Sequence, residues 1–420
     1  MEGFNSFERA ISKVLSYFPG IKYYLKWLYQ YLIFIINKKK YTYRCNYPIT
    51  LISYTTLETF FGYYDKSPQN IKKDFLLFQK SKFKTNNKPD PHQSIEIVLT
   101  NQKHNTELVI GESNAYNWQQ GTKLQWLSEY SFIYNIFDNA THTYKSRIID
   151  ARDGSETNLI NYPIYDCFKE IYALSLNFDR LAILRPDYGY LNHFKNNIDL
   201  NNIENDGVFF INLKTSEINL LISLKQLKDI TPLPSMRFAK HKVNHIMISP
   251  DGEGFVFMHR WYISGGKRYD RLLFADKNGK NIKVLADGMI SHYCWSTNNE
   301  IIVFFRHKSY GDAFYVININ TLSINLVSSK LLRLGDGHPS VINDIMVFDS
   351  YPDRSRMKKL YLYNIKNDTL EIIGEFLEPL KYFGQTRCDL HPKFNSDGSS
   401  IYIDSVHEGR RMLYEINVVE

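Results

Sequence analysis

Four histidines recur in the second half of the chain at nearly equal intervals. His245, His292, His338 and His391 are separated by 47, 46 and 53 residues. Imidazole binds Zn, Mn, Fe and Ni, and a neutral imidazole near pH 7 is also a general base. If these residues hold one position of a structural repeat, their side chains converge on a divalent metal or a substrate. The alternative is that they are packed or hydrogen-bonded residues of the interior.

Polar and charged residues accompany these histidines in the sequence. They are Asn244, Arg260, Asp336, Gln385, Arg387 and Asp389. The guanidinium of Arg387 can hold both oxygens of a carboxylate, which makes an acidic ligand the expected one. The amide of Asn244 is an expected substrate-binding group. A metal with three protein ligands keeps positions open for substrate oxygens.

Two other segments combine flat aromatic rings with amide or charged groups, as sugar-binding sites do. The first holds Tyr63, Tyr64 and Asp65, and the second holds Trp118 and Gln119. We expect these five residues to bind substrate. The other interpretation, an aromatic core beside polar turns, stays open.

Short β-strands are the elements expected to carry these residues. Beyond residue 45, short alternating or β-branched runs are separated by Gly, Asn and Asp turns. One hairpin pattern recurs at residues 208–221, 272–285, 314–327 and 360–373. A strand, a turn of the Ser-Pro-Asp-Gly type and another strand precede it. Four antiparallel strands with a period of about 50 residues form one blade of a propeller.

This repeat predicts an all-β fold, a seven-bladed β-propeller after a short N-terminal helical segment. The innermost strand of each blade lines the central channel, so the four histidines are expected at one depth. The last blade, which ends with residues 412–417, lacks one strand. The run at residues 49–54 can supply it and close the ring, which removes the open sheet edge.

Composition excludes several classes of protein. Hydrophobic residues make up 44% of the 420 residues and aromatic residues 15%, which rules out a disordered chain and a coiled coil. The four cysteines form no C-x-x-C pair, so we expect neither a zinc ribbon nor a disulfide scaffold, and a reducing compartment. No P-loop or dinucleotide fingerprint is present, which argues against nucleotide-driven chemistry.

The net charge of +7 is concentrated at the N-terminus, where residues 1–40 hold seven lysines and arginines against two glutamates. The rest is nearly neutral, so we expect no nucleic-acid partner. The uncharged run at residues 27–37 is too short to span a bilayer. Two interpretations remain for residues 17–40, a helix at an anionic membrane surface and a helix packed on the main domain. The chain is thus divided into residues 1–40 and a propeller of residues 45–420.

At these motifs the sequence resembles the oligogalacturonate lyase group of seven-bladed propellers, which are similar to TolB-type and WD40-like repeats. Residues 240–420 carry this resemblance best. Segments 62–68, 117–121, 336–339 and 387–392 resemble uncharacterised propeller proteins encoded among bacterial capsule and surface-polysaccharide genes more closely. The second resemblance implies a setting for the protein and no particular reaction.

In the lyase family, histidines and a glutamine hold a manganese ion, and another histidine is the candidate base. By position, the resemblance implies that His292, His391 and Gln385 are metal ligands and that His245 is the base. The repeat alone adds His338 to the ligands. This sequence departs from the family's Q-x-x-H-x-H spacing, because Gln385 lies six residues before His391.

Asp389 stands where that family has its other histidine, and aspartate is also a ligand for manganese. The expected cofactor is therefore a divalent metal, Mn or Zn. Arg387 and Arg260 join His245 as expected catalytic residues.

The expected function is that of a metal-assisted lyase, or a related enzyme, acting on uronate-containing surface glycans. The competing hypothesis is a non-catalytic propeller that binds a glycan or docks enzymes during capsule synthesis. An acidic polysaccharide or oligosaccharide is the expected ligand. The expected location is the cytoplasm, with residues 1–40 at the inner membrane surface.

Overall fold

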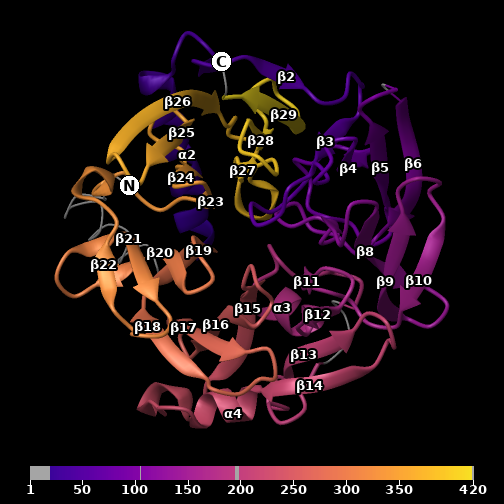
Figure 1. Cartoon of the computed structure of the whole chain (residues 1–420). Coiled ribbons are helices and arrows are strands. Elements are labelled where there is room, and N and C mark those ends of the chain that lie inside the picture. Colours follow the sequence, from indigo (N-terminus) through magenta and orange to yellow (C-terminus); the bar gives the residue numbers. More distant parts are fainter. Residues whose placement is uncertain (1–18, 105, 194–197, 419–420) are drawn as a thin grey trace.

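The computed structural model describes residues 19–104, 106–193 and 198–418. In this part of the chain, seven antiparallel sheets surround a central axis, as the blades of a propeller do (Figure 1). The expected fold, seven β-blades with a short N-terminal helix, is therefore confirmed.

The first three blades follow one another in chain order. Blade 1 contains β3 (Glu58–Phe60), β4 (Phe75–Ser81), β5 (Ile95–Asn101) and β6 (Thr106–Ser113). Blade 2 contains β7 (Gln125–Trp126), β8 (Ser131–Asp138), β9 (Thr143–Asp150) and β10 (Glu156–Ile160). Blade 3 contains β11 (Asp166–Phe168), β12 (Tyr172–Ser175), β13 (Gly207–Asn212) and β14 (Ile218–Ser223).

The next two blades hold the first two histidines of the series. Blade 4 contains β15 (Lys240–Ile248), β16 (Gly254–Tyr262), β17 (Arg268–Asp276) and β18 (Lys283–Gly288). Blade 5 contains β19 (Ile290–Trp295), β20 (Glu300–His307), β21 (Gly311–Asn318) and β22 (Ile324–Leu326).

The last two blades include strands from the N-terminal part of the chain. Blade 6 contains β23 (Ser340–Ile342), β24 (Ile345–Asp349), β25 (Met357–Asn364), β26 (Thr369–Leu377) and β1 (Tyr43–Cys45). Blade 7 contains β27 (Lys393–Phe394), β28 (Ser400–Ser405), β29 (Met412–Asn417) and β2 (Ile49–Leu51).

The ring is closed by strands from both ends of the chain. β2 pairs with β29 in antiparallel register, with Ile49 opposite Ile416 and Leu51 opposite Tyr414. This confirms the closing strand predicted at residues 49–54. β1, a fifth strand on the outer edge of blade 6, was not predicted from the sequence.

The four predicted hairpins are present as β13–β14, β17–β18, β21–β22 and β25–β26. Middle strands such as β16 are buried almost throughout, because each blade packs between two neighbours. The turn before β16 requires a glycine. Gly252 has a φ of 76°, and a Cβ there would lie 2.4 Å from the ring of Phe168.

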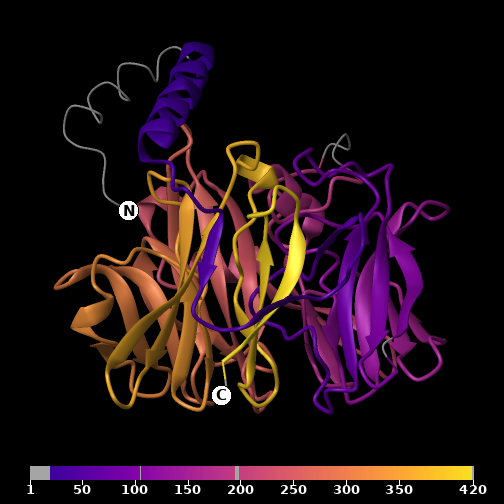
Figure 2. The same cartoon turned by 90° about the horizontal axis from the view of Figure 1, so that it is seen from above.

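Helices occupy only a small part of the described chain. They are α2 (Pro19–Asn37), α3 (Phe178–Leu184), α4 (Leu224–Asp229) and one-turn 3-10 helices at Pro234–Met236, Ser329–Leu331 and Gly384–Thr386. α2 projects from one face of the propeller (Figure 2). Among the described residues, no helix combines the length and the apolar character needed to cross a bilayer. Residues 1–18 of the expected N-terminal segment lie outside the described residues.

Candidate functional site

A loop between β3 and β4 places two tyrosines in the centre of the propeller. The backbone amides of Phe61 and Gly62 donate to the carboxylate of Asp404, at 2.9 and 3.0 Å. Gly62 has a φ of 116°, a conformation that side chains rarely adopt. The buried rings of Tyr63 and Tyr64 follow this anchor, so the two tyrosines predicted to bind substrate border the histidines directly.

The four histidines form one continuous row of buried rings. Ring centroids are 5.8 Å apart for His245 and His292, 4.0 Å for His292 and His338, and 4.4 Å for His338 and His391. His245 and His391 adopt left-handed φ values of 50° and 45°. Such conformations are uncommon for residues other than glycine and cluster at functional sites. The repeat therefore brings the four side chains together, as the sequence predicts.

Three residues at one end of this row can hold a metal ion. One ligand atom each from His338, Asp389 and His391 lies within 4.8 Å of the others, and all three residues are buried. The Nε2 atoms of both histidines are buried without a hydrogen-bond partner. Buried polar atoms are seldom left unsatisfied. Two imidazole nitrogens and a carboxylate are a donor set that suits Mn or Zn, so these residues fit the expected cofactor.

Asp349, at the end of β24, orients both histidines of this group. Its Oδ1 accepts from the Nδ1 of His338 at 2.8 Å and from the same residue's amide. Its Oδ2 accepts from the amide of His391 at 3.2 Å. With Nδ1 of His338 as the donor, Nε2 carries the lone pair that a metal needs. The sequence analysis missed Asp349, although a single carboxylate after the apolar run 345–348 is an available signal.

Charge and burial set the protonation of the three candidate ligands. Burial disfavours the charge of Asp389, but Arg387 and Lys358 hold the pKa of this carboxyl well below its usual value. Burial and the positive charge of His338 lower the pKa of His391 well below its usual value. Burial also opposes the charge of His338, but the carboxylates of Asp349, Asp389 and Asp336 together outweigh this effect and raise its pKa. Asp389 and His391 are therefore ready to bind a cation at neutral pH.

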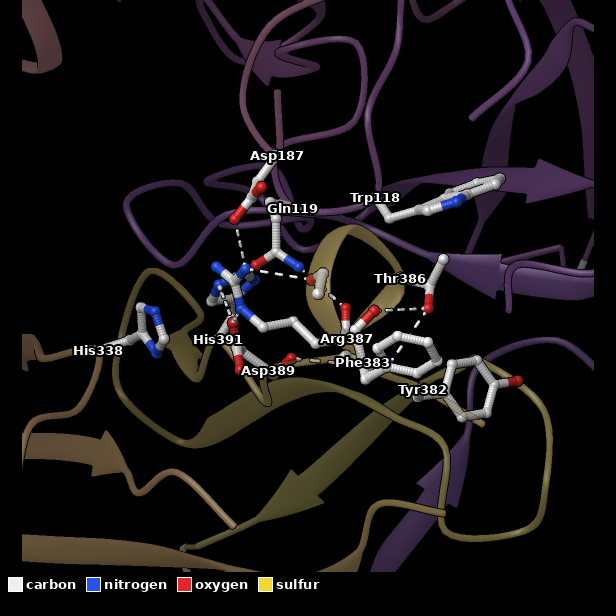
Figure 3. A network of polar contacts seen from close by, with 12 residues as sticks. Trp118, Gln119, Asp187, His338, Tyr382, Phe383, Thr386, Arg387, Asp389 and His391 are labelled. Carbon is white, nitrogen blue, oxygen red and sulfur yellow. Dashed lines mark hydrogen bonds and ion pairs between the residues drawn. The ribbon is translucent and has the colours of Figure 1, made fainter. Parts of the chain in front are cut away.

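Arg387 is held by carboxylates of the protein. Its Nε donates to Asp389 at 2.7 Å and its Nη1 to Asp187 at 2.6 Å (Figure 3). Its Nη2 donates to the hydroxyl of Tyr188 at 3.1 Å. The side chain of Gln119 lies beside it, and Nε2 of Gln119 donates to the Arg387 carbonyl at 2.9 Å. In this arrangement Arg387 positions Asp389, a role that the sequence did not indicate.

His245, at the other end of the row, forms a pair with Tyr63. The Tyr63 hydroxyl lies 2.5 Å from Nε2 of His245. Burial and the positive charges of His292 and Arg260 lower the pKa of His245 well below its usual value, so the imidazole is neutral. Burial also raises the pKa of Tyr63 well above its usual value. With the tautomer of His245 that has its proton on Nδ1, the phenol donates to Nε2, and the pair can relay a proton.

His292 and Gln385 lie outside the three-residue metal group. Nδ1 of His292 lies 3.0 Å from Oδ1 of Asp336, and the ring stands between those of His245 and His338. Gln385 is half-buried in the 3-10 helix Gly384–Thr386. The described geometry therefore supports a smaller ligand set than the one expected from the sequence.

The remaining predicted residues have different surroundings. The ring of Trp118 packs in an apolar cluster with Phe60 and Tyr116, away from His338 (Figure 3). Oδ1 of Asn244 accepts weakly from the hydroxyl of Tyr165, at 3.5 Å. Trp118 thus belongs to the aromatic core that the sequence left as an alternative, whereas Asn244 stays beside His245.

Asp65 and Arg260 both lie in buried ion pairs. A carboxylate oxygen of Asp65 is 3.7 Å from Nζ of Lys123, and its Oδ1 has no hydrogen-bond partner. Nε of Arg260 donates to Asp270. The charge of Arg260 acts on His245 as well, and adds to the effects of burial and His292 that lower the pKa of that imidazole.

A cavity of about 480 Å³ adjoins the metal group. Asp389 and Arg387 line it together with Tyr351, Phe383 and Gln30. Gln30 belongs to α2, so the N-terminal helix forms part of the cavity wall. A ligand in this cavity would meet the carboxylate of Asp389 directly.

Comparison with known proteins supports the fold. Oligogalacturonate lyase in complex with manganese has a TM-score of 0.62 at 15% identity, covering 90% of this chain and 94% of that chain. Oligogalacturonate lyase from Vibrio parahaemolyticus has a TM-score of 0.60 at 13% identity, covering 90% of this chain and 97% of that chain. The β-propeller domain of the Trilobed protease from Pyrococcus furiosus has a TM-score of 0.51 at 9% identity, covering 85% of this chain and 96% of that chain.

No protein-family model matches the chain, and no curated protein does. At identities of 9 to 15%, the likeness to the solved structures concerns the fold alone. The expected resemblance to oligogalacturonate lyases is thus confirmed as a shared seven-bladed propeller. The resemblance to propellers of capsule gene clusters stays a prediction.

Proposed function

We propose that this propeller is a metal-dependent lyase-like enzyme that acts on uronate-containing glycans in its central channel. One observation carries the proposal. Nε2 of His338 and Nε2 of His391 are buried without hydrogen-bond partners beside the ionised carboxylate of Asp389. Leaving these atoms unpaired costs free energy that a bound cation would recover.

The chemistry of uronates suits this set of groups. Removal of the proton on C5 builds negative charge on the neighbouring carboxylate, and a bound divalent metal would neutralise that charge as a Lewis acid. Arg387 keeps Asp389 ionised and in place. Tyr63 and His245 accept the C5 proton as a pair, with the imidazole as its final holder. The C4–O bond then breaks as a double bond forms between C4 and C5, and the glycosidic oxygen leaves as a hydroxyl with the proton that the imidazole returns.

Metal analysis followed by an activity assay tests this proposal. Purified protein should bind one Mn²⁺ or Zn²⁺ per chain, and His338→Ala and His391→Ala should lose it. His92→Ala is the matched control, because His92 is exposed. The metal-loaded protein should form an unsaturated, ultraviolet-absorbing product from uronate polymers, and His245→Ala should abolish that product while retaining the metal.

Two results would overturn the proposal. Protein that binds no divalent metal would remove its basis. Protein that binds metal and acidic oligosaccharides but forms no product from a broad uronate panel would instead be the non-catalytic glycan-binding propeller.

We further propose that α2 attaches the propeller to an anionic membrane surface. Leu32, Ile35 and Ile36 expose 51%, 53% and 77% of their surface, and the exposed residues Lys38 to Lys40 follow them. Exposed apolar side chains beside a lysine cluster are typical of interfacial helices. Because Gln30 of the same helix lines the cavity, this attachment would hold the site near the membrane.

A further inference from the structure

A second group of charged residues lies beside His245, on blade 4. Lys242 on β15 stands opposite Arg260 on β16, and Arg260 stands opposite Asp270 on β17. Directly opposed residues of neighbouring strands point to the same face of a sheet. Arg260 and Arg268 both pair with Asp270, the latter at 3.4 Å. One carboxylate thus serves two guanidinium groups, and Lys242 places a buried amine on the same face.

The amine of Lys242 is the unexplained member of this group. The residue is 1% exposed, and its Nζ has no hydrogen-bond partner. Burial and the positive charges of Arg260 and Arg185 lower the pKa of Lys242 well below its usual value. The amine is therefore unprotonated and unpaired in the free protein, and an anionic ligand that accepts a hydrogen bond from it would favour its charged form.

Arg185 connects this group with the rest of the channel. Its Nε is buried without a partner, and its guanidinium lies over the ring of Tyr188, with the carbon 5.3 Å from the ring centroid. The same ring lies 5.5 Å from the ring of His245 and 5.9 Å from the guanidinium of Arg387. The ring of Tyr188 therefore lies between Arg185 and His245, the candidate base, and also between Arg185 and Arg387, which positions Asp389.

Exposure suggests how a ligand reaches this group. The side chains of Arg185 and Arg268 are 30% and 37% exposed, whereas that of Arg260 is 7% exposed. The cationic residues thus extend from the surface to the buried amine of Lys242. An anionic group that follows them exchanges water for charged hydrogen bonds in surroundings of low dielectric constant.

We propose that Lys242, Arg185, Arg260 and Arg268 form an anion subsite that binds a second acidic group of the ligand. This inference rests on the proposed function for the place of the first acidic group, at the metal. The two sites that would bind anions lie on either side of His245, so the ligand class is an oligosaccharide with at least two acidic sugars. A single uronate would fill only one anchor.

Binding measurements on the metal-free protein test the subsite independently of the metal. By calorimetry, digalacturonate should bind at least tenfold more weakly to Lys242→Met than to the unaltered chain. Lys214→Met is the matched control, because Lys214 is exposed. His338→Ala should lose the metal but bind digalacturonate as tightly as the metal-free unaltered chain does. A wrong metal site would change metal binding, whereas a wrong subsite would change the effect of Lys242→Met on digalacturonate binding.

Thermal unfolding separates a binding role from a structural one. Lys242→Met removes a buried amine that has no hydrogen-bond partner, so its melting temperature should equal or exceed that of the unaltered chain, and added digalacturonate should raise it less. Equal affinity of the two chains for digalacturonate would overturn the proposal. Tight binding of inorganic sulfate or phosphate without binding of digalacturonate would overturn the assignment to acidic sugars. Equal binding of neutral digalactose would also overturn it.

Discussion

Asp349 shows how one carboxylate can prepare a metal site. It accepts hydrogen bonds from a ring nitrogen of His338 and from the amides of His338 and His391. These bonds hold both residues so that their free Nε2 atoms lie near Asp389. Such outer partners of metal ligands tune both orientation and affinity.

Asp349→Asn should therefore weaken Mn²⁺ binding without removing a ligand. An amide group offers one oxygen in place of two, so either the His338 or the His391 contact is lost. We expect a loss of about 10- to 100-fold in affinity, measured by calorimetry. Asp153→Asn, at an exposed turn, is the control. Unchanged affinity would show that Asp349 has no role in metal binding.

The pH dependence of metal binding should come mainly from His338. Asp389 has a depressed pKa and stays ionised, and His391 has a depressed pKa and stays neutral, across the neutral range. The carboxylate of Asp349 raises the pKa of His338 above its usual value despite burial, so a proton competes with the metal as the pH falls through this raised pKa. Mn²⁺ titrations in buffers of different ionisation enthalpy should show release of about one proton per metal near pH 6. Release of none, or of two, would contradict this assignment.

At the scale of elements, α2 is the part whose role the propeller does not explain. It projects from the face of the ring, yet Gln30 contributes to the wall of the cavity (Figure 2). Apolar side chains exposed on a short helix are costly in water and favourable at a lipid interface.

Flotation with anionic vesicles tests this role. The full chain should float with the vesicles, and the double variant Ile35→Glu and Ile36→Glu should not, because it places two charges on the inserted face. Since both side chains are exposed, the circular dichroism of the propeller should not change. High salt should weaken the attachment without abolishing it. Equal flotation of both proteins would mean that α2 binds a protein partner or the propeller itself.

At the scale of the whole molecule, stability depends on closure of the ring. β2 supplies the outer strand of blade 7, and the amide of Ile52 just beyond it donates to Leu413 at 3.1 Å. β1 only extends the outer edge of blade 6. The two N-terminal strands should therefore differ in importance.

Two truncations measure this difference. Deletion of residues 1–46 removes β1 and keeps the closing strand, whereas deletion of residues 1–55 removes both. The longer deletion should lower the free energy of unfolding by about 2–4 kcal/mol more than the shorter one, through lost ladder bonds and apolar contacts. Urea titration followed by tryptophan fluorescence gives this comparison. Equal midpoints would show that β2 adds nothing to stability.

The sequence by itself determined the blades and the closing strand. A hairpin such as residues 272–285 depends on side chains that alternate between the two faces of a strand and on the residues of its turn. Both are local features of the sequence. Gly252 could be assigned to the turn before β16 because the residue types of that turn are also local. The row of histidines follows from that register, because equal positions in successive blades point into one channel.

Only the tertiary structure decided how the site works. Arg387 donates to Asp187, 200 residues away in the sequence, and to Asp389. The sequence predicted that Arg387 binds the carboxylate of the substrate, whereas in the structure it positions Asp389. Trp118 lies in the core, and Nζ of Lys242 has no hydrogen-bond partner. Sequence separation does not determine distance across a ring of blades. Protonation depends on burial and on neighbouring charges, which exist only once the blades have packed around the channel.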